Sequence, residues 1–199
     1  MVISALGYPT AAKHDDVELD RVIAEMAGTI AGWSVESGLW DLYLLRLRVL
    51  RTLCWGEIEA ARTLVFSAWP GMEAKRLLSM PIARGPAHVV RAAVVLESLA
   101  DGAGDARALV RDAERSARVL AREDRADGAV QAAVIRASIA HHLGDRKRRD
   151  EGLADAEARA RIADMRTAQR MIARTRARLD GDEARRADHD TALLALGVV

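Results

Sequence analysis

The chain has 199 residues, of which 50% are hydrophobic and 30% charged, so it suits one folded domain or one short repeat array and does not suit a disordered protein. Its 30 basic and 29 acidic side chains give a net charge of +1. Nucleic-acid-binding domains usually carry a basic excess, so we expect no nucleic-acid partner.

The sequence favours a bacterial, cytoplasmic protein. It contains no Asn and is rich in Arg and Ala, which is typical of GC-rich bacterial genomes. The single cysteine, Cys54, cannot form an internal disulfide, which fits a reducing compartment. Residues 1–12 lack the charged and long apolar segments of a signal peptide. The most apolar stretch, 39–55, is interrupted by four charged residues, namely Asp41, Arg46, Arg48 and Arg51. We therefore expect no membrane span and no membrane partner.

Periodic apolar residues predict helices throughout the chain. Aromatic residues make up only 4% of it, and no stretch has the pattern of a strand. The predicted helices span 16–33, 38–55, 57–69, 72–79, 83–100, 105–122, 126–143, 146–162, 164–179 and 182–196. Breakers at Trp69-Pro70-Gly71 and at Pro81 to Pro86 are expected to isolate the short helix 72–79.

A repeated dipeptide marks the corners between these helices. Glycine closes a helix in the left-handed conformation, and an acidic residue caps the next helix. The dipeptides are Gly56-Glu57, Gly104-Asp105, Gly144-Asp145 and Gly181-Asp182. Their spacings of 48, 40 and 37 residues are typical of helix-pair repeats. The predicted fold is all-α: one domain, 1–199, forming an α–α superhelix of tetratricopeptide-like helix pairs at about 1–33, 38–69, 83–122, 126–162 and 164–196.

The chain lacks the phosphate-binding loop and the catalytic motifs of kinases, ATPases, hydrolases and metalloproteases. His141 and His142 are adjacent on a helix and point about 100° apart, so we interpret them as a helix-end pair and not as metal ligands. Cys54 is interpreted as a buried, inert thiol, and the basic run Arg146–Arg149 as a solvated helix face. We expect no catalytic residue, no metal and no cofactor.

Aromatic side chains cluster in the first third of the chain, and they are the candidate partner-binding residues. Core packing is the simpler interpretation of them, and a groove that binds a protein or peptide segment is the alternative. The candidates are Trp33, Trp40, Tyr43 and Trp69.

Six segments together carry a family resemblance: Ile30 to Ser34 (IAGWS), Ala68-Trp69-Pro70, Ala100 to Glu123, Leu143-Gly144-Asp145, Gly181-Asp182-Glu183 and Leu196-Gly197. They resemble the C-terminal helical-repeat region of multidomain bacterial serine/threonine protein kinases of the myxobacterial type. The resemblance implies a non-catalytic interaction and regulatory module for signal transduction, whose partners include the upstream kinase and ATPase-like domains. A helical arm of an ATPase-type transcriptional regulator and a small all-helical enzyme are the alternatives.

The helix predicted at 16–33 has apolar side chains on more than one stripe, including Val17, Val22, Ile23 and Met26. An end repeat needs a polar outer face or a cover. We therefore expect upstream sequence, or a second copy of the chain, to cover this N-terminal edge. If a second copy covers it, Val22→Glu or Ile23→Glu should relieve self-association.

Overall fold

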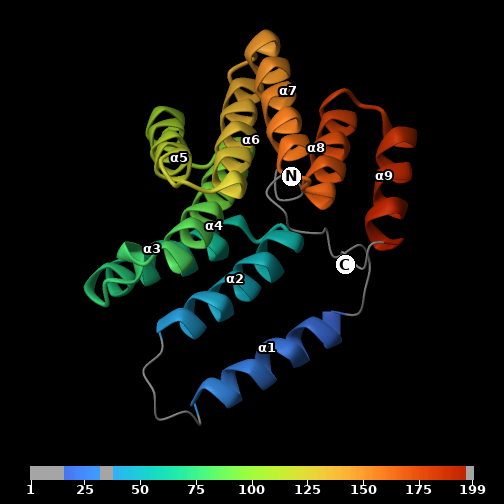
Figure 1. Ribbon diagram of the computed structural model, residues 1–199. Coiled ribbons are helices and arrows are strands. Elements are labelled where there is room, and N and C mark those ends of the chain that lie inside the picture. The colour runs from blue at the N-terminus through green and yellow to red at the C-terminus, as the bar shows by residue number, and fades with distance from the viewer. Residues whose placement is uncertain (1–15, 32–37, 196–199) are drawn as a thin grey trace.

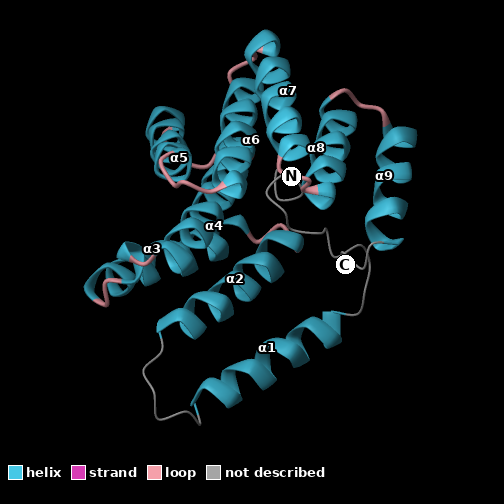
Figure 2. Ribbon diagram, in the orientation of Figure 1, coloured by secondary structure: helices cyan, strands magenta, loops and turns pink. Residues whose placement is uncertain are grey.

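The computed structural model describes residues 16–31 and 38–195, and all regular elements in these ranges are helical (Figures 1 and 2). The prediction of an all-α chain is thus confirmed. The elements are α1 (Asp16–Ala31), α2 (Gly38–Cys54), α3 (Ile58–Ala74), the 3-10 turn η2 (Leu77–Ser79), α4 (Pro81–Ala100), α5 (Ala106–Ala121), α6 (Ala126–His142), α7 (Arg146–Ile162), α8 (Arg166–Leu179) and α9 (Glu183–Ala195).

Neighbouring helices along the chain pack against one another, and α2 and α6 also contact α4 directly. In Figure 1, α3 and α5 lie on the left of α4, and α1 and α9 are at the two ends of the assembly. The helix α4 therefore has neighbours on several sides, namely α2, α3, α5 and α6. Its residues 92–98 are all buried as a result.

The core is built from small and aliphatic side chains. Leu96, Leu120, Ile135 and Leu153 are at most 1% exposed, and each stabilises the fold by about 1.5–3 kcal/mol through burial. Alanines lie between them and let the helices approach closely. The most extensive contact joins α6 and α7. The helices α4 and α6 thus contribute many of the buried residues, and the surface features described below lie around them.

The predicted breaks at the prolines are wrong. The helix α3 continues through Pro70 to Ala74, and α4 begins at Pro81 and continues through Pro86. Pro81 lies in the first helical position, where a missing N–H costs nothing. The segment predicted as a helix at 72–79 divides between the end of α3 and η2, because Met72 and Leu77 are both buried against the core. Burial here outweighs the lost hydrogen bonds at Pro70 and Pro86.

Three of the four predicted glycine corners agree with the prediction. At the fourth, Gly102 (φ 73°) and not Gly104 ends α4, because its N–H bonds to the Leu99 carbonyl. Gly56, Gly104, Gly144 and Gly181 have φ between 74° and 95°. The side chains of Asp105, Asp145 and Asp182 accept hydrogen bonds from backbone N–H groups in the first turn of the next helix. Glu57 makes no such bond, in line with its weaker capping tendency.

One corner of the same kind has no glycine. At the α7–α8 corner Asp164 has a φ of 49°. The Met165 N–H bonds to the Ala160 carbonyl at 2.8 Å, as the Asp145 N–H bonds to the Ala140 carbonyl at 2.9 Å. Aspartate tolerates the left-handed conformation better than most residues, which explains why it replaces glycine here. The sequence search for Gly-acidic pairs could not find this corner.

We expect Asp164→Gly to raise the free energy of unfolding by about 0.5–1 kcal/mol, because glycine takes a positive φ without strain. At another corner, Gly144→Val should lower the free energy of unfolding by more than about 1 kcal/mol, since a β-branched residue is strained at a positive φ. Urea denaturation followed by circular dichroism measures both. If Gly144→Val unfolds at the same urea concentration as the wild type, the corner geometry is wrong.

The N-terminal helix α1 contacts α2, with an ion pair between Asp20 and Arg51 at 3.1 Å. Val22 is 36% exposed, whereas Ile23 and Met26 are half-buried. The side chain of Val17 lies outside the part of the helix whose side chains are described. The covering of this edge by a second copy or by upstream sequence therefore stays a prediction.

Candidate ligand-binding pocket between α2, α4 and α6

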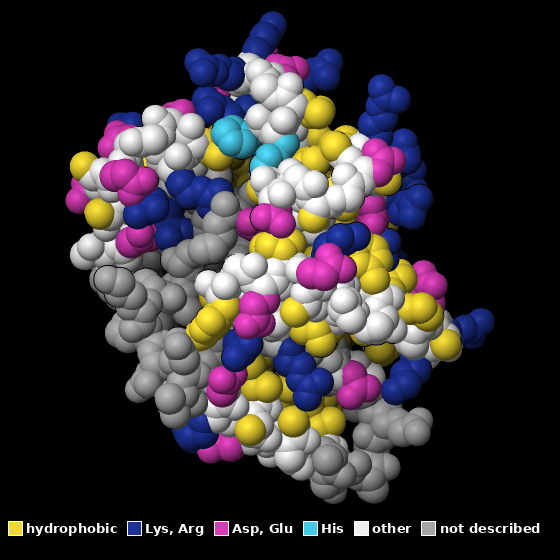
Figure 3. Space-filling model, turned by 180° about the vertical axis from the view of Figure 1, so that it is seen from behind, with side chains coloured by type: hydrophobic (Ala, Val, Ile, Leu, Met, Phe, Trp, Pro, Cys, Tyr) yellow, Lys and Arg dark blue, Asp and Glu magenta, His cyan; other side chains and the backbone are white. Residues whose placement is uncertain are grey.

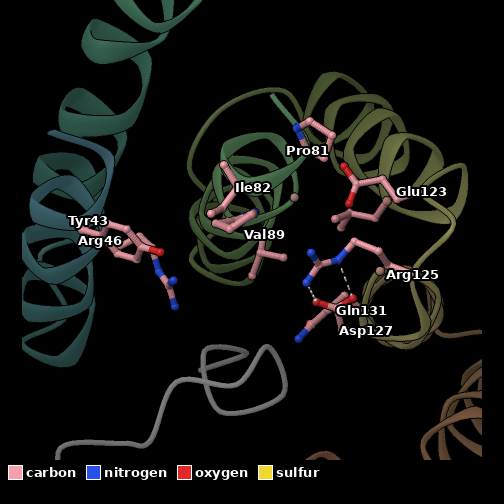
Figure 4. A pocket seen from close by; sticks show the side chains of 13 residues that line it. Tyr43, Arg46, Pro81, Ile82, Val89, Glu123, Arg125, Asp127 and Gln131 are labelled. Carbon is pink, nitrogen blue, oxygen red and sulfur yellow. Dashed lines mark hydrogen bonds and ion pairs between the residues drawn. The ribbon is translucent and has the colours of Figure 1, made fainter. Parts of the chain in front are cut away.

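A pocket of about 320 Å³ opens between α2, the first turns of α4 and the α5–α6 corner (Figure 4). This volume is within the range of about 300–1,000 Å³ that is usual for small ligand sites. Its lining comes from segments that are far apart in the sequence: Tyr43, Arg46, Pro81, Ile82, Gly85, Pro86, Val89, Leu120, Glu123, Arg125, Asp127, Gly128 and Gln131.

One wall of the pocket is apolar and belongs to α4. Ile82, Pro86 and Val89 lie on one face of this helix because they are four and three residues apart. Ile82 is 52% exposed, and in Figure 4 it lies beside Val89 in the middle of the pocket. Tyr43 faces this wall from α2. An aliphatic side chain of a ligand would bury apolar surface here.

The opposite wall is polar, and its charges are matched in pairs. The guanidinium of Arg84 donates to Glu123 at 2.8 Å, and the Glu123 side chain is only 4% exposed. Arg125 donates to both carboxylate oxygens of Asp127, at 2.9 and 2.7 Å. This hydrogen bonding lowers the pKa of Asp127. The wall thus presents neutralised pairs, which do not favour a polyanion.

The polar wall is held together by a glycine where α5 and α6 approach each other. A Cβ added to Gly128 at the start of α6 would lie 2.7 Å from the Leu120 carbonyl oxygen of α5. Only glycine allows this approach of the two backbones. The corner that carries Arg125 and Asp127 is therefore fixed by packing beneath it.

Gln131 adds an unsatisfied polar group to the pocket. Its Oε1 is buried and has no hydrogen-bond partner among the described residues. The residue as a whole is half-buried and lines the pocket. A buried acceptor without a donor costs about 1–3 kcal/mol. A ligand N–H group could recover this cost if the amide turned toward the pocket, because Oε1 itself has almost no exposed surface.

Two of the predicted aromatic residues lie together beside this pocket. The rings of Trp40 and Tyr43 are 5.9 Å apart, Trp40 is 37% exposed and Tyr43 lines the pocket. Trp33 lies outside the described residues. Trp69 does not line the pocket, because its ring packs between α3 and α4.

Trp69 instead belongs to a cluster that joins α3, α4 and α5. The Arg91 guanidinium carbon lies 4.3 Å from the centre of the Trp69 ring and 4.8 Å from that of Phe66. Arg91 also forms a bidentate ion pair with Asp112 of α5, with bonds of 3.0 and 2.9 Å. Arg91 thus links two aromatic rings of α3 to Asp112 of α5, so we interpret this cluster as a structural contact between three helices.

A histidine lies at the centre of the same contact. The His88 ring is 5.2 Å from Trp69, and its Nδ1 is 3.3 Å from the Ser116 hydroxyl. Burial lowers the pKa of His88 to about 4, and the nearby Arg91 adds to this effect. His88 is therefore neutral at pH 7.

The remaining predicted polar features lie at the α6–α7 corner and at the end of α2. Arg146, Lys147 and Arg148, at the start of α7, are exposed. Lys and Arg side chains project at the upper edge of the molecule in Figure 3. Over the rest of the described surface in this view, acidic, basic and hydrophobic side chains are mixed. His141 and His142 contact each other with ring centres 5.5 Å apart, and burial lowers the pKa of both. Cys54 is half-buried.

Among the described residues, no three His, Cys, Asp or Glu side chains gather closely enough to bind a metal ion. None of the described helices is sufficiently long and apolar to cross a membrane. Comparison of the chain with protein-family models, curated proteins and solved structures finds no match. The function must therefore be argued from the pocket itself.

The sequence analysis missed most of the pocket. The sequence places Ile82 between predicted helices and predicts Pro86 to be a helix breaker, and Gln131 is one polar residue within the predicted helix 126–143. A proline inside an apolar helical pattern is the signal that could have drawn attention to α4, because it leaves a backbone carbonyl without its usual donor.

Proposed function

We propose that this chain is a non-catalytic, tetratricopeptide-like helical repeat that binds a peptide segment of another protein in the pocket between α2, α4 and α6. The observation that carries the proposal is the pocket's combination of an exposed aliphatic wall, at Ile82, with an unsatisfied acceptor, at Gln131. The lining combines an apolar wall on α4 with a polar wall at the α5–α6 corner, and a mixture of apolar surface and convergent polar groups is typical of binding sites.

The contacts between helices support the superhelical part of this proposal. The helices α2, α4 and α6 contact one another in turn, while α3 and α5 pack between successive members of this series. Stacked helix pairs produce this pattern, and their inner helices line a surface used for binding. The resemblance to kinase-associated helical tails supports a regulatory role, with the peptide supplied by a signalling partner.

The charge of the site supports a peptide over a nucleic acid. The lining contains two arginines, Arg46 and Arg125, and two acidic residues, Glu123 and Asp127. Phosphate backbones are bound by an excess of Lys and Arg, which this lining does not have. A peptide with aliphatic side chains and free backbone N–H groups suits it better.

The proposal is tested by selecting binders from a displayed library of random twelve-residue peptides and measuring dissociation constants by fluorescence anisotropy. Ile82→Glu should weaken the selected peptides by at least about tenfold, because it places a charge on the apolar wall. Ile162→Glu is the matched control, since Ile162 is 88% exposed and lies outside the pocket. Failure to select any peptide, or equal binding by the Ile82→Glu variant, would refute the proposal.

A further inference from the structure

The helix α4 has a backbone acceptor that its own sequence leaves open. In an α-helix the carbonyl of residue 82 accepts from the N–H of residue 86. Residue 86 is proline and has no N–H, so this hydrogen bond cannot form in α4. Ile82 and Pro86 both line the pocket, which places the carbonyl between them on the same face.

A second acceptor lies across the pocket on α6. The hydrogen bonds of the described residues do not include either end of the Gln131 amide, and its Oε1 is buried without a donor. The last torsion of a glutamine side chain is soft, so the amide can turn toward the pocket at little cost. Two acceptors thus belong to pocket-lining residues: the Ile82 carbonyl lacks its helical donor, and Gln131 Oε1 lacks any donor and reaches the pocket when the amide turns.

The space between these acceptors is apolar. Ile82 and Val89 form the wall next to the open carbonyl, and Tyr43 faces them from α2. A ligand that fills the pocket must bring donors for both walls and an apolar group for the middle. An extended peptide does this, because its backbone N–H groups alternate with its side chains along the chain.

We infer that the pocket recognises an extended peptide through its backbone: one N–H donates to the Ile82 carbonyl, a second donates to Gln131 Oε1, and an aliphatic side chain between them packs on Ile82 and Val89. This inference rests on the proposed function and specifies how the peptide is held. A lysine or arginine side chain is less well suited, because Glu123 and Asp127 already have guanidinium partners in Arg84 and Arg125.

Proline at position 86 thus has a role in recognition. It keeps the Ile82 carbonyl available, as an open strand edge does for a partner strand. The change Pro86→Ala would supply an N–H in the same helix. This N–H would take one lone pair of the carbonyl and compete with the peptide for it. The variant should therefore gain a helical hydrogen bond and lose one to the peptide.

The experiment uses the full chain with isotope-labelled backbone, methyl and side-chain amide groups, titrated by NMR with the peptide acetyl-Ala-Ala-Leu-Ala-Ala-amide. We expect shifts of the Ile82 and Val89 methyl groups and of the Gln131 side-chain amide. Five further peptides each carry one N-methyl group, at successive backbone nitrogens. N-methylation at two of the five positions should weaken binding by about tenfold each, and at the others much less.

Two variants assign these positions. Pro86→Ala should weaken the unmethylated peptide by about tenfold and abolish the effect of one of the two N-methyl groups. Gln131→Leu should also weaken the unmethylated peptide by about tenfold and should abolish the effect of the other N-methyl group. In each variant, the N-methyl group at the unaffected position should still weaken binding. Circular dichroism melting curves show whether both variants fold. Ile162→Glu again serves as the control that should change nothing.

The outcomes separate the two proposals. If the peptide binds and shifts the Ile82 methyl group but every N-methyl peptide binds equally, the backbone recognition is refuted and the pocket is retained. If Pro86→Ala leaves the N-methyl pattern unchanged, the role of the carbonyl is refuted. If neither this peptide nor any library peptide binds the chain, the proposed function fails and this inference fails with it.

Discussion

Lowering the pH from about 6.5 to 4 should destabilise the protein by about 3 kcal/mol through His88 alone. Burial lowers the pKa of His88 to about 4, whereas an unfolded histidine has a pKa of about 6.5. The unfolded state therefore takes up the proton first, and the folded state loses stability as the pH falls through this window. Above pH 6.5 both states are neutral at this residue, and the contribution is fully present.

The measurement is urea denaturation at several pH values for the wild type and for His88→Gln. The variant lacks the titrating ring, so the difference in unfolding free energy between the two proteins should change by about 3 kcal/mol across the window and level off below pH 4. The groups that titrate elsewhere cancel in this difference. A difference that stays constant from pH 7 to 4 would show that His88 titrates normally in the folded protein.

A leucine at Gly152 should destabilise the fold by at least about 3 kcal/mol, because the α6–α7 contact has no room for a side chain. A Cβ added to Gly152 would lie 3.0 Å from the Cβ of Ala137 and 3.5 Å from the Ala133 carbonyl oxygen. A leucine would place further atoms into this contact and force the two helices apart. Thermal melting followed by circular dichroism measures the effect.

Two variants calibrate this prediction. Gly152→Ala adds only the Cβ, so its gain in helix propensity and its close contact should nearly cancel. Gly28→Leu makes the larger change in α1, where a Cβ meets nothing within 4 Å, and should stabilise the helix slightly. The interpretation of the α6–α7 contact is wrong if Gly152→Leu and Gly28→Leu melt at the same temperature.

The elements that the sequence predicts well are those set by local chemistry. The helices and the glycine corners follow from periodicity and from the left-handed preference of residues such as Gly144. The errors occur where tertiary burial overrides a local signal. Pro70 and Pro86 should have ended helices, but the buried residues that flank them, such as Met72 and Ala87, make the helical path more stable.

The pocket could not be predicted for a different reason. Tyr43, Ile82 and Gln131 are widely separated in the sequence, and nothing in their local surroundings indicates that three helices bring them together. Clustering along the chain groups the aromatic residues but does not predict their partners. Tyr43 is on α2 and lines the pocket, whereas Trp69 is on α3 and packs against Arg91.

The neighbour-to-neighbour packing of the helices has a consequence for how the protein opens. In such an array each unit is stabilised mainly by the next, so the ends can unfold in steps while the centre stays intact. Amide hydrogen exchange would then show a gradient of protection, highest in α4 and α6. The pocket draws its lining from α2, α4, α5 and α6. A bound peptide would contact all of these helices, so they should unfold together and their amide protection should rise to one common level.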